Sequence, residues 1–214
     1  MNTLEKLNPE LIGYIEECHF MTFFRHPLCV MPYSKGTEDK ELAVNGMINT
    51  LVSGRTKIIM DLESKGDYAS ILHLVERPFR LEYAIKYLHL VSDFEYWDIV
   101  DYVWTDSENP SVNLDLWERI FSNRKYSNPS LKSKTVNTLP KEVTIYRGGN
   151  HKGLSWTLDK SQAEWFAKRF DSNQTVMIAT VNKADILHYT DSRGEQEIVA
   201  SPSRVNVLFE EQLA

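Results

Sequence analysis

Apolar residues in the first part of the chain, from residue 3 to about residue 122, recur at intervals of three and four positions. In LEYAIKYLHLVSDF, one face of a helix would carry Leu81, Ala84, Ile85, Leu88 and Val91. The same spacing runs through PELIGYIEECHF, DKELAVNGMINTLVSG, YASILHLVERPF, EYWDIVDYVW and NLDLWERIF. The segment FRHPLCVMPY is interpreted as a helix end followed by an extended turn. The pattern therefore predicts a helical region over residues 1–125, with about five to seven helices.

The periodic pattern lapses between Ser122 and Pro140, where the sequence is SNRKYSNPSLKSKTVNTLP. This stretch is rich in Ser, Asn, Lys and Pro and carries few residues that could bury apolar surface. We predict a linker over residues 126–140. The local basic residues are interpreted as solvated side chains of this stretch; they are Arg124, Lys125, Lys132 and Lys134.

After the linker the pattern changes to short runs rich in Val, Ile, Thr and aromatic residues, separated by Gly, Asn, Asp or Pro. The runs are VTIYR (143–147), LSWT (154–157), TVMIATV (175–181), ADILHYT (184–190), EQEIVAS (195–201) and RVNVLFE (204–210). Between them DKSQAEWFAKRF predicts one helix, with Asp159 as its N-cap and Ala163, Phe166, Ala167 and Phe170 facing inward. Residues 141–214 should form a compact sheet with one strong helix, so the predicted fold class is α+β.

Composition narrows the function classes. With 42% hydrophobic and 25% charged residues the chain is typical of a soluble globular protein, and no stretch approaches the length of a membrane span. The segment MNTLEKLNPELIGYIEE lacks the features of a signal peptide, which predicts a cytoplasmic location. The net charge of −6 argues against binding to nucleic acid. Cys18 and Cys29 are expected to be buried free thiols, and the histidine spacing predicts no metal site.

Three short motifs follow one another at the edges of predicted strands. They are YRGG with Arg147, LSWT with Ser155 and Thr157, and GEQEIV with Glu195 and Glu197. The glycine turn is not a P-loop, because no GK[ST] follows it, and it lacks GxGxxG spacing. Together and in this order, the motifs resemble the signature of the arginine-serine-glutamate class of mono-ADP-ribosyltransferases. Those enzymes carry an Arg on a first strand, a Ser-x-Ser/Thr on the next and a Glu-x-Glu near the start of a later strand.

The resemblance, which covers about residues 141–212, implies an ADP-ribosyltransferase-like core that binds NAD as a substrate. Arg147 would then present a fixed cation to the two phosphates of NAD. Glu197 would stabilise the positive charge that develops on the ribose as nicotinamide leaves. Ser155 would support the nicotinamide ribose and Glu197, whereas Thr157 would brace the strand.

The resemblance also implies roles for residues around these motifs. In the family the upstream carboxylate marks members that modify arginine, and here it corresponds to Glu195. The glycine pair that begins with Gly148 would let the chain turn sharply and approach the ligand. Phe166 or Trp165 would stack on nicotinamide. The turn HYTDSRG would recognise the target, with Tyr189 or Asp191 as contacts.

The predicted function is transfer of ADP-ribose from NAD to a protein side chain, an arginine, by a toxin, bacterial effector or phage-borne protein acting in a host cytoplasm. The same residues, taken singly, allow simpler interpretations. Trp156 is expected in the core, and Trp97, Tyr102 and Trp104 in the core or an interface. Two alternatives remain open: an NAD glycohydrolase, in which water replaces the target, and a non-catalytic binding protein that keeps the fold. The helical region would select the target or cover the cleft.

Overall fold

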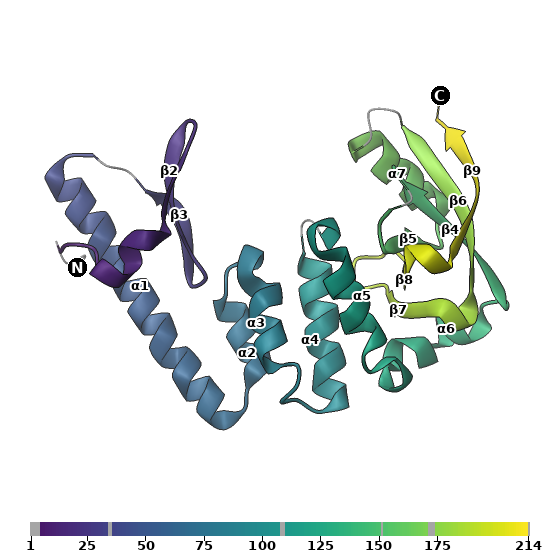
Figure 1. The fold of residues 1–214 in the computed structure, drawn as a ribbon, viewed down its shortest axis with the longest axis horizontal. Helices are drawn as coiled ribbons and strands as arrows, with labels where there is room; N and C mark the ends of the chain where they lie inside the picture. The colour runs from purple at the N-terminus through teal and green to yellow at the C-terminus, as the bar shows by residue number, and fades with distance from the viewer. Residues whose placement is uncertain (1–4, 34–35, 108–109, 151, 171–173, 214) are drawn as a thin grey trace. The chain divides into compact units, whose positions relative to one another are not determined.

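A computed structural model of the protein describes residues 5–33, 36–107, 110–150, 152–170 and 174–213. The chain divides into two compact units, Met1–Val91 and Ser92–Ala214. Each unit combines helices with one antiparallel sheet, which confirms the α+β class (Figure 1). The division therefore falls at Val91 and not within the linker predicted at residues 126–140.

The first unit contains a three-stranded sheet that the sequence pattern did not predict. After a 3-10 helix, Pro9–Tyr14, strands β1 (Ile15–Cys18), β2 (Met21–His26) and β3 (Cys29–Tyr33) pair in order. The prediction of helix for PELIGYIEECHF was therefore wrong from Ile15 onward, where β1 begins. The segment FRHPLCVMPY forms the end of β2 and all of β3, so the predicted helix end and extended turn were wrong. These apolar runs are short and rich in aromatic and β-branched residues. A short run of this kind fits both the helical spacing of three to four residues and the two-residue alternation of a strand, so only its pairing partners decide the structure.

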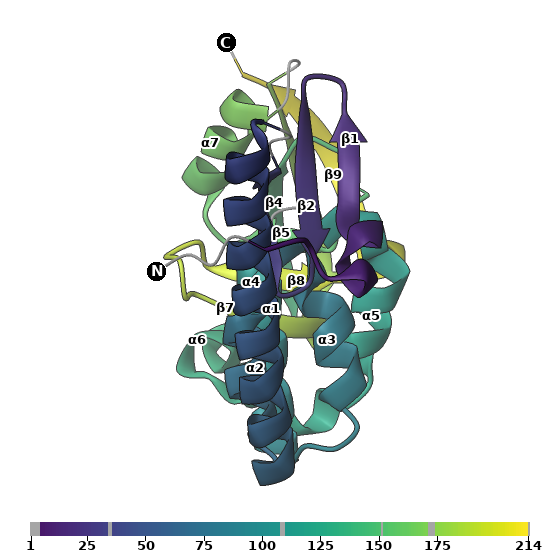
Figure 2. The ribbon, with the colours of Figure 1, turned by 90° about the vertical axis from the view of Figure 1, so that its left-hand side faces the viewer.

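Helices complete the first unit. They are α1 (Glu38–Lys65), α2 (Tyr68–Leu74), a 3-10 turn (Arg77–Phe79) and α3 (Arg80–Tyr87). One part of α1 packs Ile48 and Val52 against Phe24 of β2, and the strands beside this long helix are visible in Figure 2. Of the two cysteines, Cys29 is buried in this cluster, as expected, whereas Cys18 is exposed, so the prediction for Cys18 was wrong.

The second unit begins with helices that belong to the same compact body as the C-terminal sheet. They are α4 (Asp93–Asp106), a 3-10 turn (Pro110–Asn113), α5 (Leu114–Ser122), two further 3-10 turns (Lys125–Ser127 and Pro129–Lys132) and α6 (Lys134–Thr138). The predicted linker is thus folded. Asn128 is buried and its side-chain amide donates to the carbonyl of Leu187, and Val136 lies in the core under the sheet.

Six antiparallel strands form the sheet of this unit, in the order β7-β8-β5-β4-β6-β9. They are β4 (Glu142–Gly148), β5 (Ser155–Thr157), β6 (Thr175–Asn182), β7 (Ile186–Thr190), β8 (Glu197–Ala200) and β9 (Val205–Gln212). Each of the six predicted runs overlaps one of these strands, which confirms the prediction. The three strands that carry the motifs, β4, β5 and β8, are neighbours, and the register pairs Tyr146 with Thr157 and Thr157 with Glu197.

Helix α7 (Lys160–Phe170), which the sequence pattern predicts, packs on β4. The Asp159 carboxylate caps it by accepting from the Ser161 backbone N–H at 2.8 Å, and Ala163 and Ala167 are fully buried. Gly148 lies so close to the helix that a Cβ there would overlap its backbone. At the next position, Gly149 has a φ of +89°, which L side chains rarely adopt. The glycine pair therefore serves helix packing and the turn.

Candidate active site

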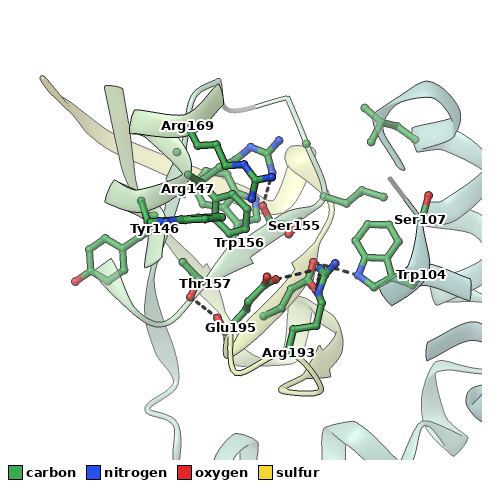
Figure 3. A pocket seen from close by; sticks show the side chains of 18 residues that line it. Trp104, Ser107, Tyr146, Arg147, Ser155, Trp156, Thr157, Arg169, Arg193 and Glu195 are labelled. Atoms are coloured by element: carbon green, nitrogen blue, oxygen red, sulfur yellow. Dashed lines mark hydrogen bonds and ion pairs between the residues drawn. The ribbon is translucent and has the colours of Figure 1, made fainter. Parts of the chain in front are cut away.

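A cleft of about 510 Å³ opens where β4, β5, β8, α7 and the end of α4 meet in the second unit (Figure 3). This volume lies within the usual range of small-molecule sites, roughly 300–1,000 Å³. The cleft is lined by all three motif residues of the resemblance, Arg147, Ser155 and Glu197. Antiparallel pairing of neighbouring strands brings them together, because β5 lies between β4 and β8.

Arg147, near the end of β4, is held in place by backbone groups. Its Nε donates to the carbonyl of Asn150 at 2.7 Å, and Nη1 donates to the carbonyl of Ser155. Gly153 lies directly against the guanidinium, where a Cβ would overlap it. Burial lowers the pKa of Arg147, and the negative charge of Glu197 acts in the opposite direction. Since arginine titrates far above neutral pH, the cleft keeps a positively charged, oriented guanidinium.

The second motif contributes one side chain to the cleft and one to its framework. Ser155 is half-buried in the wall of the cleft, next to β8. Thr157 is buried, and its hydroxyl donates to the Glu195 carbonyl at 2.6 Å while it accepts from the Asp159 N–H at 3.0 Å. Thr157 thereby connects β5, the start of α7 and the third motif, in agreement with a bracing role. Trp156 is 2% exposed, which confirms its place in the core.

Glu197, the first residue of β8, is a buried carboxylate at the wall of the cleft. Only 4% of the residue is exposed. Its Oε1 accepts a hydrogen bond from the indole N–H of Trp104 on α4, at 3.1 Å. Among the described residues its Oε2 has no hydrogen-bond partner, and Nη2 of Arg193 lies 3.8 Å away. A buried polar atom without a partner is costly, so this oxygen is available to a ligand group.

Burial raises the pKa of Glu197 above its ordinary value. The Ser155 hydroxyl, the Arg193 guanidinium and the Trp104 indole each favour the charged form and lower the pKa, whereas the negative charge of Glu195 raises it. The net direction is upward because removing a carboxylate from water disfavours its charge. Perturbed carboxyl groups of this kind cluster at functional sites.

Glu195 lies two residues before β8 and is less deeply buried than Glu197, with 18% of its side chain exposed. Its carboxylate pairs with Nη2 of Arg193 at 3.0 Å. Between the two glutamates, Gln196 adopts a φ of +45°. A positive φ at a residue other than glycine is uncommon, and strained backbone of this kind clusters at functional sites. This local backbone kink places both carboxylates beside the same guanidinium.

Helix α7 contributes Trp165 and Phe166 to the cleft. Their rings meet edge to face with centroids 5.0 Å apart, and the guanidinium of Arg169 lies over the Trp165 ring at 4.9 Å. Trp165 is 48% exposed, so it is a surface of the cleft and not a core residue. Gly148 also lines the cleft, beside the helix that packs on it.

The loop before β8 corrects one expectation, and this loop and α4 each supply a residue that sequence reasoning missed. Tyr189 packs in the core, so the structure contradicts it as a target contact, whereas Asp191 is exposed and its carboxylate accepts from the Gln196 N–H at 3.0 Å. Trp104 was expected only as core or interface, and Arg193 was not singled out at all. No spacing signal could reveal Trp104, which is 93 positions from Glu197 in the chain.

Comparisons with protein-family models, curated proteins and solved structures gave no match to this chain. In the described part of the chain, no helix has the length and apolar character needed to cross a bilayer. The described residues also include no group of three or more His, Cys, Asp or Glu side chains placed to hold a metal ion. Function must therefore be inferred from the cleft itself.

Proposed function

We propose that the cleft binds NAD and that the protein transfers ADP-ribose from NAD to an arginine side chain of a target protein. The observation that carries this proposal is the convergence of Arg147, Ser155 and Glu197 in one cleft. One buried oxygen of Glu197 has no hydrogen-bond partner among the described residues. The order of these residue types along the chain supports it through the resemblance to arginine-serine-glutamate transferases. The residues fit the substrate, because a fixed cation, an aromatic pair and a carboxylate match its phosphates, nicotinamide and ribose.

In this mechanism Arg147 holds the phosphates and Trp165 or Phe166 holds the nicotinamide ring. The bond between nicotinamide and ribose breaks, and its electron pair leaves with nicotinamide. Glu197 stabilises the positive charge that develops on the sugar, in a site where little water screens the interaction. Glu195 orients the incoming guanidinium and accepts its proton as the new carbon–nitrogen bond forms. With water as the acceptor, the same steps would give the glycohydrolase reaction.

The experiment that tests this proposal follows two products with one labelled substrate. Purified protein is incubated with labelled NAD and with agmatine, a small guanidine acceptor, and nicotinamide release and labelled agmatine are measured separately. We expect both products. Nicotinamide with free ADP-ribose and no labelled agmatine would identify a hydrolase instead. If neither product forms but NAD binds with Arg147-dependent affinity, the protein is a non-catalytic NAD-binding protein, and the proposed transfer is wrong.

The same transfer reaction should label the protein target and so identify it. Labelled NAD incubated with a cell lysate, followed by mapping of the modified residue, would identify it. The proposal requires that the label be attached to arginine. We propose that the protein itself acts in the cytoplasm, either of the producing cell or of a host cell.

A further inference from the structure

An arginine of the chain itself, Arg193, lies beside the two glutamates of the cleft. Nη2 of Arg193 lies 3.0 Å from Oε2 of Glu195, and these two side chains are labelled in Figure 3. The same nitrogen lies 3.8 Å from Oε2 of Glu197. One guanidinium nitrogen therefore contacts the carboxylate assigned to the acceptor and approaches the carboxylate assigned to the sugar.

The loop that carries Arg193 is ordered by its own hydrogen bonds. The Gly194 N–H donates to the Asp191 carbonyl at 3.0 Å, and Gly194 has a φ of +70°. Nη1 of Arg193 donates to the Thr105 carbonyl at the end of α4, at 2.9 Å. The guanidinium is thus oriented on one side by α4 and on the other by the glutamates. Holding a reacting group in place in advance removes much of the entropic cost of a second reactant.

Arg193 is also accessible. Its side chain is 45% exposed, whereas Arg147 is engaged by two backbone carbonyls inside the cleft. Water reaches this side of the ion pair with Glu195 and weakens it, so the guanidinium can shift among its partners. A group that is both near the carboxylates and free to adjust can follow the reacting carbon as the sugar moves.

We propose that Arg193 is a self-modification site, to which the protein transfers ADP-ribose within its own chain. This inference rests on the proposed function and deepens it by naming an acceptor. The bond between nicotinamide and the ribose carbon breaks, and nicotinamide leaves with the electron pair. A terminal nitrogen of Arg193 gives a proton to Glu195 and bonds to that carbon. The products are nicotinamide, a proton and ADP-ribosylated Arg193.

The modification has a consequence for the site. An ADP-ribosyl group on Arg193 would stand at the cleft beside both glutamates and obstruct the next acceptor. Transfer to external guanidines should therefore slow as the modified fraction grows. Arg193→Lys keeps the positive charge but removes the guanidinium, so this variant should avoid the slowing.

The test uses the full-length protein with NAD, followed by mass spectrometry of intact protein and of the peptide that contains residue 193. We expect one ADP-ribosyl group on that peptide in the wild type and none in Arg193→Lys. The matched control is Arg204→Lys, an exposed arginine outside the cleft, which should label like the wild type. If each chain labels itself, the first-order rate constant for labelling should not depend on protein concentration. In a mixture with Glu197→Gln, only the wild-type chains should carry label.

Agmatine in a parallel reaction separates the two possible failures. If agmatine is labelled but residue 193 is not, the self-modification inference is overturned and the proposed transfer stands. If label appears on residue 193 of Glu197→Gln in the mixture, modification occurs between chains and the inference is likewise overturned. If neither agmatine nor protein is labelled, the proposed function itself fails.

Discussion

At the residue scale, the most unusual group in the cleft is Glu197, a buried carboxylate. One of its oxygens accepts no hydrogen bond from the part of the chain that the structure describes. Its raised pKa means that the folded protein holds this proton more tightly than the unfolded chain does. The stability linked to this proton is fully present below the unfolded pKa, about 4.3, and is lost as the pH rises through the folded pKa. At neutral pH, Glu197 therefore lowers the free energy of unfolding.

Glu197→Gln should accordingly unfold at a higher temperature than the wild type near neutral pH. The difference should shrink as the pH falls and vanish below about pH 4, where both states of the wild type carry the proton. Each kcal/mol gained corresponds to about 2–4 °C for a protein of this size. Thermal unfolding followed by circular dichroism over a pH series measures this. Glu195→Gln, which removes a less buried carboxylate paired with Arg193, is the control and should show no such gain.

Substitution of the two glutamates should also affect nicotinamide release and transfer to agmatine differently. Glu197→Gln is expected to lose both nicotinamide release and transfer to agmatine, by about 10²- to 10³-fold, as when one transition-state contact is removed. Glu195→Gln should keep nicotinamide release and lose transfer, because Glu195 acts on the acceptor. Parallel assays of both products measure this division, and equal losses of both activities in the two variants would contradict it.

At the scale of elements, α4 reaches the site through Trp104, whose indole N–H binds Glu197 while its ring packs edge to face on Trp117 and Phe121. Trp104→Phe removes the donor and retains an aromatic ring. Because the indole lowers the pKa of Glu197, the variant should need a higher pH for ionisation of Glu197. The acidic limb of the pH–activity profile should move to higher pH, with activity recovering there. A uniform loss at every pH would indicate a packing defect instead.

The close packing of α7 on β4 at Gly148 is a second feature at the scale of elements. At Gly148 a Cβ would overlap backbone atoms of Ala163 and Ala167, which no side-chain rotation relieves. Gly148→Ala should therefore force α7 away from the strand and cost about 1–3 kcal/mol, as overpacked cores do. Denaturant unfolding measures the loss. Gly54→Ala in α1, where the added methyl meets open space, should be neutral or stabilising by comparison.

At the scale of the whole molecule, the sheet and the helices from Ser92 onward form one compact unit. Trp97 and Phe121 stack on His188 of β7, and Val136 of α6 lies in the core of the sheet. A fragment of residues 141–214 lacks all these partners and should aggregate. Residues 92–214 should fold alone and cleave NAD at a rate near that of the full chain, while losing selectivity for lysate proteins. Solubility, cooperative unfolding and nicotinamide release of the two fragments test this.

Local pattern alone predicted the C-terminal strands, α7 and its Asp159 cap, because each depends on residues close together in the chain. The same reasoning failed over residues 15–33, where short apolar runs fit either period and only pairing between strands decides. It also failed over residues 126–140, where polar residues such as Asn128 are satisfied by distant carbonyls.

The sequence alone also determined that Arg147, Ser155 and Glu197 follow one another as three motifs, because each motif can be identified from residues close together in the chain. The tertiary structure decided their convergence, the burial of Glu197 and the placement of Arg193 beside two carboxylates. The contact from Trp104 depends on packing α4 beside a strand 93 positions away. Burial and long-range hydrogen bonds set these properties, and both exist only once distant segments are packed together.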